Sequence, residues 1–180
     1  IPGVSSSMAN YTAFTAEVEA IFPKKIEESN SAYFDTPFLT SSIYGFHTAN
    51  TGTTGLSWKS PDFDLQVYSL RPERDSKDVY FNIQNTDGTI NLTTEIFKDV
   101  YDNQKWNFAI RLKPADFPSP NLPSGSGNDG YLLEFSGINS LAEYVSSEFS
   151  LTASINHASG TAFLNEAKRF YLGAHRTNFT

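Results

Sequence analysis

The stretch WNFAIRLK, residues 106–113, decides the fold class of this chain because its apolar and polar side chains alternate strictly. Trp106, Phe108, Ile110 and Leu112 would lie on one face of an extended strand, and the residues between them on the other. A period of two is typical of a strand with one buried face. Residues 106–113 therefore predict a strand of an antiparallel sheet, with Trp106 in the core.

The same alternation recurs along most of the chain. It is clear in residues 79–84, 90–94, 131–136, 149–156 and 170–174, and weaker around Ile43 with Gly45 and Leu65 with Val67. Residues 85–88 read as a hairpin turn, since Asp-Gly tolerates a positive φ. Several short strands separated by turns, without long amphipathic helices between them, predict an all-β, antiparallel two-sheet β-sandwich.

Two segments are less clear. In residues 11–22, Phe14, Ala16, Val18, Ala20 and Phe22 fit a strand face, whereas Phe14, Val18, Ile21 and Phe22 fit a helical stripe. We favour the strand, because Pro23 ends the segment and its neighbours are strands. Ser140 and Glu143 have the spacing of a capping box that precedes Tyr144 and Val145, and they predict one short helix there.

Bulk properties limit the classes of function. The chain has 180 residues, which fits one domain spanning 1–180, and a net charge of −7 that disfavours a nucleic-acid partner. No apolar run approaches the roughly 20 residues that a membrane-spanning helix needs. Cysteine is absent, so disulfides and thiolate metal sites are excluded. The chain opens at Ile1 without a methionine, and we expect it to be a segment of a longer protein.

Four sequence blocks carry a family resemblance: residues 106–111, 131–137, 149–153 and 170–174, the last leading into residues 178–180. They resemble laminin-G-like domains of the concanavalin-A-like jelly-roll superfamily, as found in large phage and viral structural proteins such as tail or surface components. The resemblance implies a jelly roll that binds glycans or protein ligands at loop rims, sometimes through Ca²⁺. It also implies a virion or extracellular location within a larger assembly. In the family a glycine and a final strand follow, so we expect a continuation or another chain to supply that strand.

The candidate ligand-binding residues lie in loops. Trp58 could stack on a sugar ring, although a packing role, in which its indole holds the long loop in place, fits better. Tyr101, Asp102 and Asn103 form a second polar and aromatic loop. A glycan site needs such an aromatic ring with polar groups beside it.

A calcium ion is the one cofactor that the loops suggest. Asn128 and Asp129, together with Asp87, offer the oxygen ligands that Ca²⁺ prefers. The turn-forming tendency of the same residues explains them without a metal. Asp129 and Asp87 are the predicted metal ligands, and no other cofactor is expected.

The catalytic candidates are weak. Glu17 and Glu19 would share one strand face, as the carboxylates of concanavalin-A-like glycosidases do, but position 21 is Ile21 where a third acid is expected. We therefore interpret the two glutamates as a solvated strand face. The histidines at 47, 157 and 175 have no short metal spacing and no obvious acid partner, and are expected to be surface or satisfied side chains.

Three hypotheses follow. The leading one is a non-catalytic recognition or structural module of a viral or extracellular surface protein that mediates attachment or assembly and could bind glycans. The second is a glycan-degrading enzyme of the concanavalin-A-like superfamily. The third is an architectural domain whose exposed edge strand pairs with a neighbour.

Overall fold

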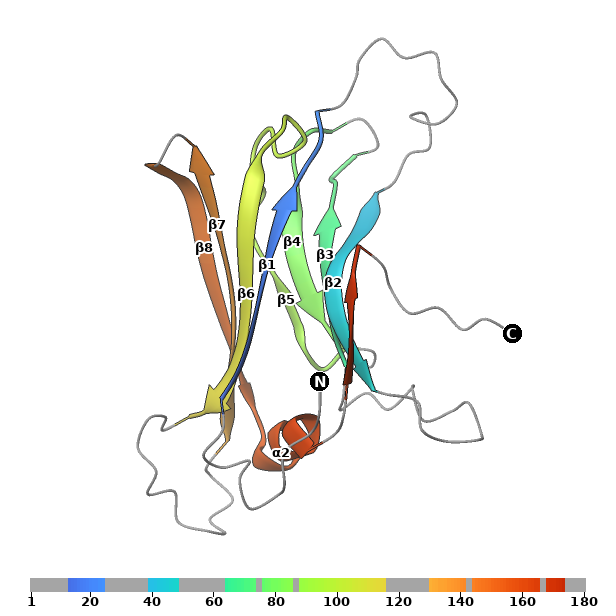
Figure 1. Ribbon diagram of the computed structural model, residues 1–180, viewed down its shortest axis with the longest axis vertical. Helices are drawn as coiled ribbons and strands as arrows, with labels where there is room; N and C mark the ends of the chain where they lie inside the picture. Colours follow the sequence, from blue (N-terminus) through green and yellow to red (C-terminus); the bar gives the residue numbers. More distant parts are fainter. Residues whose placement is uncertain are drawn as a thin grey trace, which may run out of the picture.

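The computed structural model of the protein describes residues 13–24, 39–48, 64–73, 76–85, 88–115, 130–141, 144–165 and 168–173. Figure 1 shows two sheets stacked as layers, with a single described helix at the lower end of this view. Sheet A has the order β1-β6-β7-β8 and sheet B the order β5-β4-β3-β2-β9, and the neighbouring strands among the described residues are all antiparallel. The prediction of an all-β, two-sheet sandwich is confirmed.

The element bounds follow the sequence alternation closely. Sheet A contains β1 (Phe14–Ile21), β6 (Lys105–Pro114), β7 (Tyr131–Leu141) and β8 (Tyr144–Ile155). Sheet B contains β2 (Thr40–Thr48), β3 (Leu65–Leu70), β4 (Tyr80–Gln84), β5 (Asn91–Thr93) and β9 (Lys168–Leu172). The helix α2 (His157–Asn165) lies between β8 and β9. The strand interpretation of the segment around Phe14 is thus confirmed.

The core is a cluster of aromatic rings between the sheets. All four alternating residues of β6, including Trp106, are buried, as predicted. The Phe81 ring of β4 lies 4.9 Å from the Trp106 ring and 4.8 Å from the Phe108 ring, both in edge-on contacts. Such contacts add to the free energy of burying the rings, so the two sheets are held chiefly by this cluster.

The hairpin from β4 to β5 forms as expected. The backbone N–H of Asn85 donates to the carbonyl of Ile90, and the Asn85 side-chain oxygen accepts from the Ile90 N–H at 2.9 Å. Gly88 has a φ of 76°, which a residue with a side chain rarely adopts. Its place in the turn follows from that requirement.

The predicted helix near Glu143 is wrong. Tyr144 and Val145 begin β8, where Tyr144 pairs with Leu141 and Val145 with Ser140 across the β7–β8 hairpin. The ladder continues from there to Tyr131 and Ile155. Many cross-strand hydrogen bonds stabilise this hairpin, whereas a capping box stabilises only one helix end, so the local signal was overridden.

The observed helix α2 was not predicted. The Asn156 side-chain oxygen caps it by accepting from the Ser159 N–H at 2.8 Å. Phe163 and Leu164 are buried, and the helix closes the lower end of the sandwich in Figure 1. The helix contains Gly160 and few large apolar side chains, so it shows little helical periodicity.

Candidate functional site

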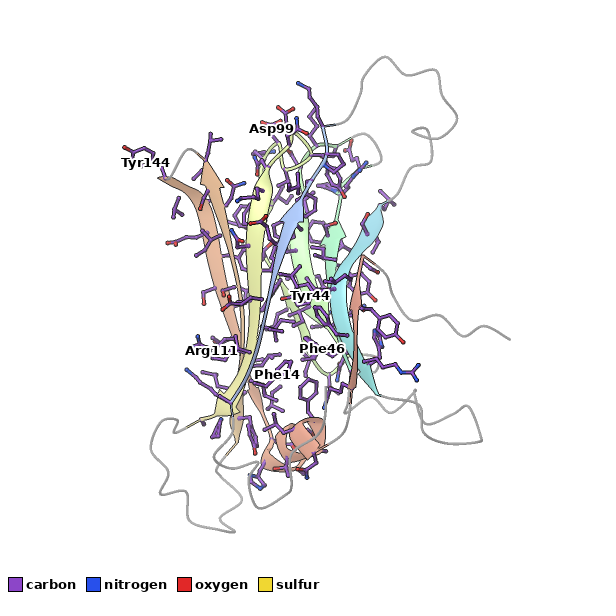
Figure 2. The ribbon with its side chains drawn as sticks, viewed as in Figure 1. Phe14, Tyr44, Phe46, Asp99, Arg111 and Tyr144 are labelled. Carbon is purple, nitrogen blue, oxygen red and sulfur yellow. The ribbon has the colours of Figure 1, made fainter. Side chains whose placement is uncertain are left out.

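Among the described residues the two sheets have different numbers of strands, and this leaves one side of the sandwich without a facing strand. At one side β8 lies beside β5. Towards the other side β1 lies over β2, where the Phe14 and Phe46 rings meet at 4.9 Å in the inter-sheet space (Figure 2). Sheet A ends at β1, but sheet B continues to β9. Among the described strands none lies opposite β9.

An open groove of about 570 Å³ lies along this side. One wall is formed by β1 and the segment that follows it, residues 17–23. The other wall is formed by residues 41–43 of β2 and by the end of β9 with Gly173. The lining residues on the two walls include Val18, Ile21, Ile43, Phe170 and Leu172. Glu17, Glu19, Ser41, Ser42 and Ser69 also line the groove, so its walls carry both apolar and polar groups.

The last strand departs from its prediction. The alternation of residues 170–174 predicted buried side chains, and Phe170 and Leu172 do pair with Phe46 and Tyr44, whose rings are buried in the core. Phe170 is nevertheless 38% exposed and Leu172 61% exposed. They lie on the inward face of sheet B, but none of the described strands of sheet A covers them. Residue 174 lies outside the described residues.

Tyr101 does not fit the predicted role of an exposed sugar-stacking ring. It is only 8% exposed, with the Arg71 guanidinium 3.9 Å above its ring and the Phe22 ring 5.3 Å away. Its hydroxyl lies 3.5 Å from the Ser69 hydroxyl in the lining of the groove. A ring covered in this way cannot stack on a sugar, so Tyr101 contributes packing and one polar atom.

Asp102 and Asn103 lie in the turn before β6, and both contact Lys24. The Lys24 ammonium is 3.3 Å from the Asp102 carboxylate, and the Lys24 backbone N–H donates to the Asn103 side-chain oxygen at 2.9 Å. Asn103 has a φ of 64°, a conformation that asparagine tolerates. These contacts hold the segment after β1 against the turn, which fixes the upper end of the groove.

The outer edge of β1 carries the exposed carboxylates. Glu17 and Glu19 point to the outer face of sheet A and are exposed, so the prediction of a solvated strand face is confirmed. The Glu19 carboxylate is 3.2 Å from the Lys105 ammonium. Ile21, at the position where a third acid was sought, is also exposed.

Tyr44 of β2 has a fully buried phenol side chain. Burial raises its pKa far above the ordinary tyrosine value, and the Glu17 carboxylate adds to the rise. Its hydroxyl has no hydrogen-bond partner among the described residues. The phenol therefore stays neutral at any physiological pH.

A buried polar cluster on the outer face of sheet B was not expected. His47 Nε2 lies 3.0 Å from Gln66 Oε1, and His47 Nδ1 lies 3.9 Å from a carboxylate oxygen of Asp64. The Gln66 amide donates to the carbonyls of Tyr44 and Val67. The expectation that His47 has no acid partner is wrong, because β2 and β3 bring the two residues together across 16 residues of intervening sequence. His157 is exposed at the start of α2, 3.4 Å from Thr161, and residue 175 is not described.

A second, smaller pocket of about 230 Å³ lies between the lower ends of the sheets. Its apolar lining includes Leu112, Leu133 and Phe163, and its polar lining includes Asp64 and Asn156. Nothing in the sequence analysis pointed to it, because its residues come from both sheets and α2.

The other predicted ligand and metal residues lie outside the described residues. These are Trp58, Asp87, Asn128 and Asp129. Within the described ranges, no three or more histidine or acidic side chains are grouped as a metal ion would require. The described helix is also too short and polar to cross a membrane. No family model matches the chain, and no curated protein or solved structure shows significant similarity to it.

Proposed function

We propose that this chain is a non-catalytic recognition or structural module that mediates attachment or assembly by binding a partner in the open groove. The exposure of Phe170 and Leu172 carries the proposal. Both side chains lie on the sheet face that forms the core elsewhere, yet both remain accessible beside the edge strand β1. Exposed apolar surface of this kind, bordered by polar groups, is typical of binding sites.

The lining of the groove favours a protein partner over a glycan. Its large apolar side chains are mostly aliphatic or phenyl groups, and its polar residues are Ser41, Ser42 and Ser69 together with Glu17 and Glu19 of β1. A sugar needs planar amide or carboxylate groups around a free aromatic face, and the Tyr101 ring is covered. A glycan-binding version of the proposal would rest on Trp58 instead.

An enzymatic role in glycan hydrolysis is the alternative. It would require Glu17 and Glu19 to act as acid and base or nucleophile. Glu19 is engaged by Lys105 on an exposed strand face, and Ile21 replaces the third acid. These observations favour binding without catalysis.

The setting of the module is also part of the proposal. The laminin-G-like sequence blocks support a place in a viral or extracellular surface assembly, and the acidic, serine- and threonine-rich composition is compatible with it. Calcium bound through Asp129 and Asp87 remains a separate prediction.

The proposal can be tested with two arrays, one of immobilised glycans and one of immobilised peptides. The native chain is compared with Leu172→Lys, which places a charge in the groove, and with Tyr144→Ser, which changes an exposed residue at the tip of the β7–β8 hairpin. We expect peptide binding that is lost in Leu172→Lys and kept in Tyr144→Ser. Binding that survives Leu172→Lys, or no binding on either array, would contradict the proposal. Glycan binding lost in Leu172→Lys would support the groove but change the class of partner.

A further inference from the structure

The backbone of β1 presents an unused hydrogen-bonding edge towards the groove. The Phe22 N–H donates to the Gln104 carbonyl, so the register of β1 and β6 places residues 14, 16, 18, 20 and 22 in hydrogen-bonded pairs with β6. The N–H and C=O groups of the alternate residues then point away from β6. These residues are Thr15, Glu17, Glu19 and Ile21, and no described residue pairs with their backbone groups.

We propose that the partner binds as an antiparallel strand added to β1. This inference rests on the proposed function and names the class of partner. The added strand would extend sheet A to five strands, so that each strand of sheet B has a counterpart. Unpaired edge strands are known templates for such additions.

The two faces of β1 specify the side chains of the added strand. Directly opposite residues in an antiparallel pair share a face. Residues opposite Ala16, Val18 and Ala20 would point inward, over the exposed Phe170 and Leu172, and must be apolar. Residues opposite Glu17 and Glu19 would point to the outer face, where a lysine or arginine would meet a carboxylate.

Charge also excludes the simplest alternative, a second copy of β1. In the antiparallel register centred on Val18, which keeps the outer faces of both strands on one side, two copies of β1 would place Glu17 opposite Glu19 twice. Like charges directly opposite each other destabilise a strand pair. The chain carries a net charge of −7, which further disfavours self-association and favours a basic partner. The partner is therefore an extended segment that alternates apolar and basic residues.

A synthetic peptide tests the geometry directly. The probe alternates lysine and valine over eight residues, the length of β1. One derivative is N-methylated at the backbone amides of the lysines, because these N–H groups would face β1. A control derivative is N-methylated at the backbone amides of the valines, because these N–H groups would face solvent. We expect the first derivative to bind at least about tenfold more weakly than the unmodified peptide, and the control to bind as well as the unmodified peptide.

Two measurements on the protein complete the test. Amide hydrogen exchange at Thr15, Glu17, Glu19 and Ile21 should slow when the peptide binds, because these N–H groups become paired. The double variant Glu17→Lys and Glu19→Lys should lose the lysine peptide and bind a glutamate–valine peptide instead. Glu148→Lys, an exposed glutamate on β8, is the matched control and should bind as the native chain does.

The outcomes separate this inference from the proposed function. Three results together would overturn strand addition: equal binding of both methylated peptides, unchanged amide hydrogen exchange at β1, and loss of binding in Leu172→Lys. The groove would then bind its partner without a strand being added to β1. If no peptide and no glycan binds the native chain, the proposed function fails and the inference fails with it.

Discussion

Replacing Gly45 with alanine tests whether the buried polar cluster on sheet B stabilises the fold. A β-carbon at this position would collide with the Gln66 Oε1, would lie 2.7 Å from Gln66 Cδ, and would lie 2.9 Å from the Leu65 carbonyl oxygen. The Gln66 side chain would have to leave its place. It would then lose its bonds to His47 and to the carbonyls of Tyr44 and Val67.

The cost follows from these three hydrogen bonds. Each contributes about 1 kcal/mol net, so Gly45→Ala should lower the free energy of unfolding by about 2 to 3 kcal/mol. Urea denaturation followed by circular dichroism measures this change, provided that the dependence on urea concentration is the same for both proteins.

A double-mutant cycle identifies the cause. In a Gln66→Ala background the collision with the amide is gone, so Gly45→Ala should cost only about 1 kcal/mol, from the contact with the Leu65 carbonyl. A cost of Gly45→Ala below about 0.5 kcal/mol, or an equal cost with and without Gln66, would show that displacement of the Gln66 amide is not the cause.

Three further predictions have definite expected results. Phe81→Ala should lower the free energy of unfolding by about 3 to 5 kcal/mol, and Phe170→Ala by about 1 kcal/mol or less, because only the Phe81 ring is fully enclosed. Thermal and urea unfolding measure both values, and equal values for the two variants would contradict the prediction. Glu17→Gln should leave any glycan hydrolysis by the preparation unchanged, and a large loss of rate would instead support the enzymatic alternative. The Lys98 ammonium, 2.6 Å from the Asp78 carboxylate, holds the pKa of Asp78 below its ordinary value, helped by the Asp99 N–H. The stabilisation from ionised Asp78 is therefore present above the ordinary aspartate pKa and is lost as the pH falls through the lowered pKa of Asp78 in the folded protein. In Lys98→Met, an NMR titration should show a higher pKa for Asp78 than in the native chain. An unchanged pKa would contradict the contact.

The sandwich was predictable chiefly because the strands of sheet A alternate almost without exception. The residues of β6 from Trp106 to Leu112 bury every second side chain, as does β7 from Tyr131 to Phe135. A period of two forces this outcome once one face of a sheet is covered. The errors occurred where a local signal competed with pairing to a distant segment, as at Ser140 and Glu143.

The candidate site was less predictable, since aromatic loop residues were expected to bind a ligand. Tyr101 proved to be enclosed by Phe22 and Arg71, which lie far from it in the sequence. The apolar residues at the groove, Phe170 and Leu172, looked like ordinary core positions. No sequence pattern states how many strands the opposite sheet contains.

The amino-acid pattern alone indicates which residues form strands and which side chains of a strand face the same way, because alternation is a local property of the extended chain. Which strands are neighbours, and therefore which inward faces are covered, depends on the three-dimensional arrangement of the strands. Four strands stack on five, so Phe46 is buried under β1 while Phe170, its partner in the ladder, is left accessible. Burial depends on what lies opposite a side chain in space, and that is set by long-range packing.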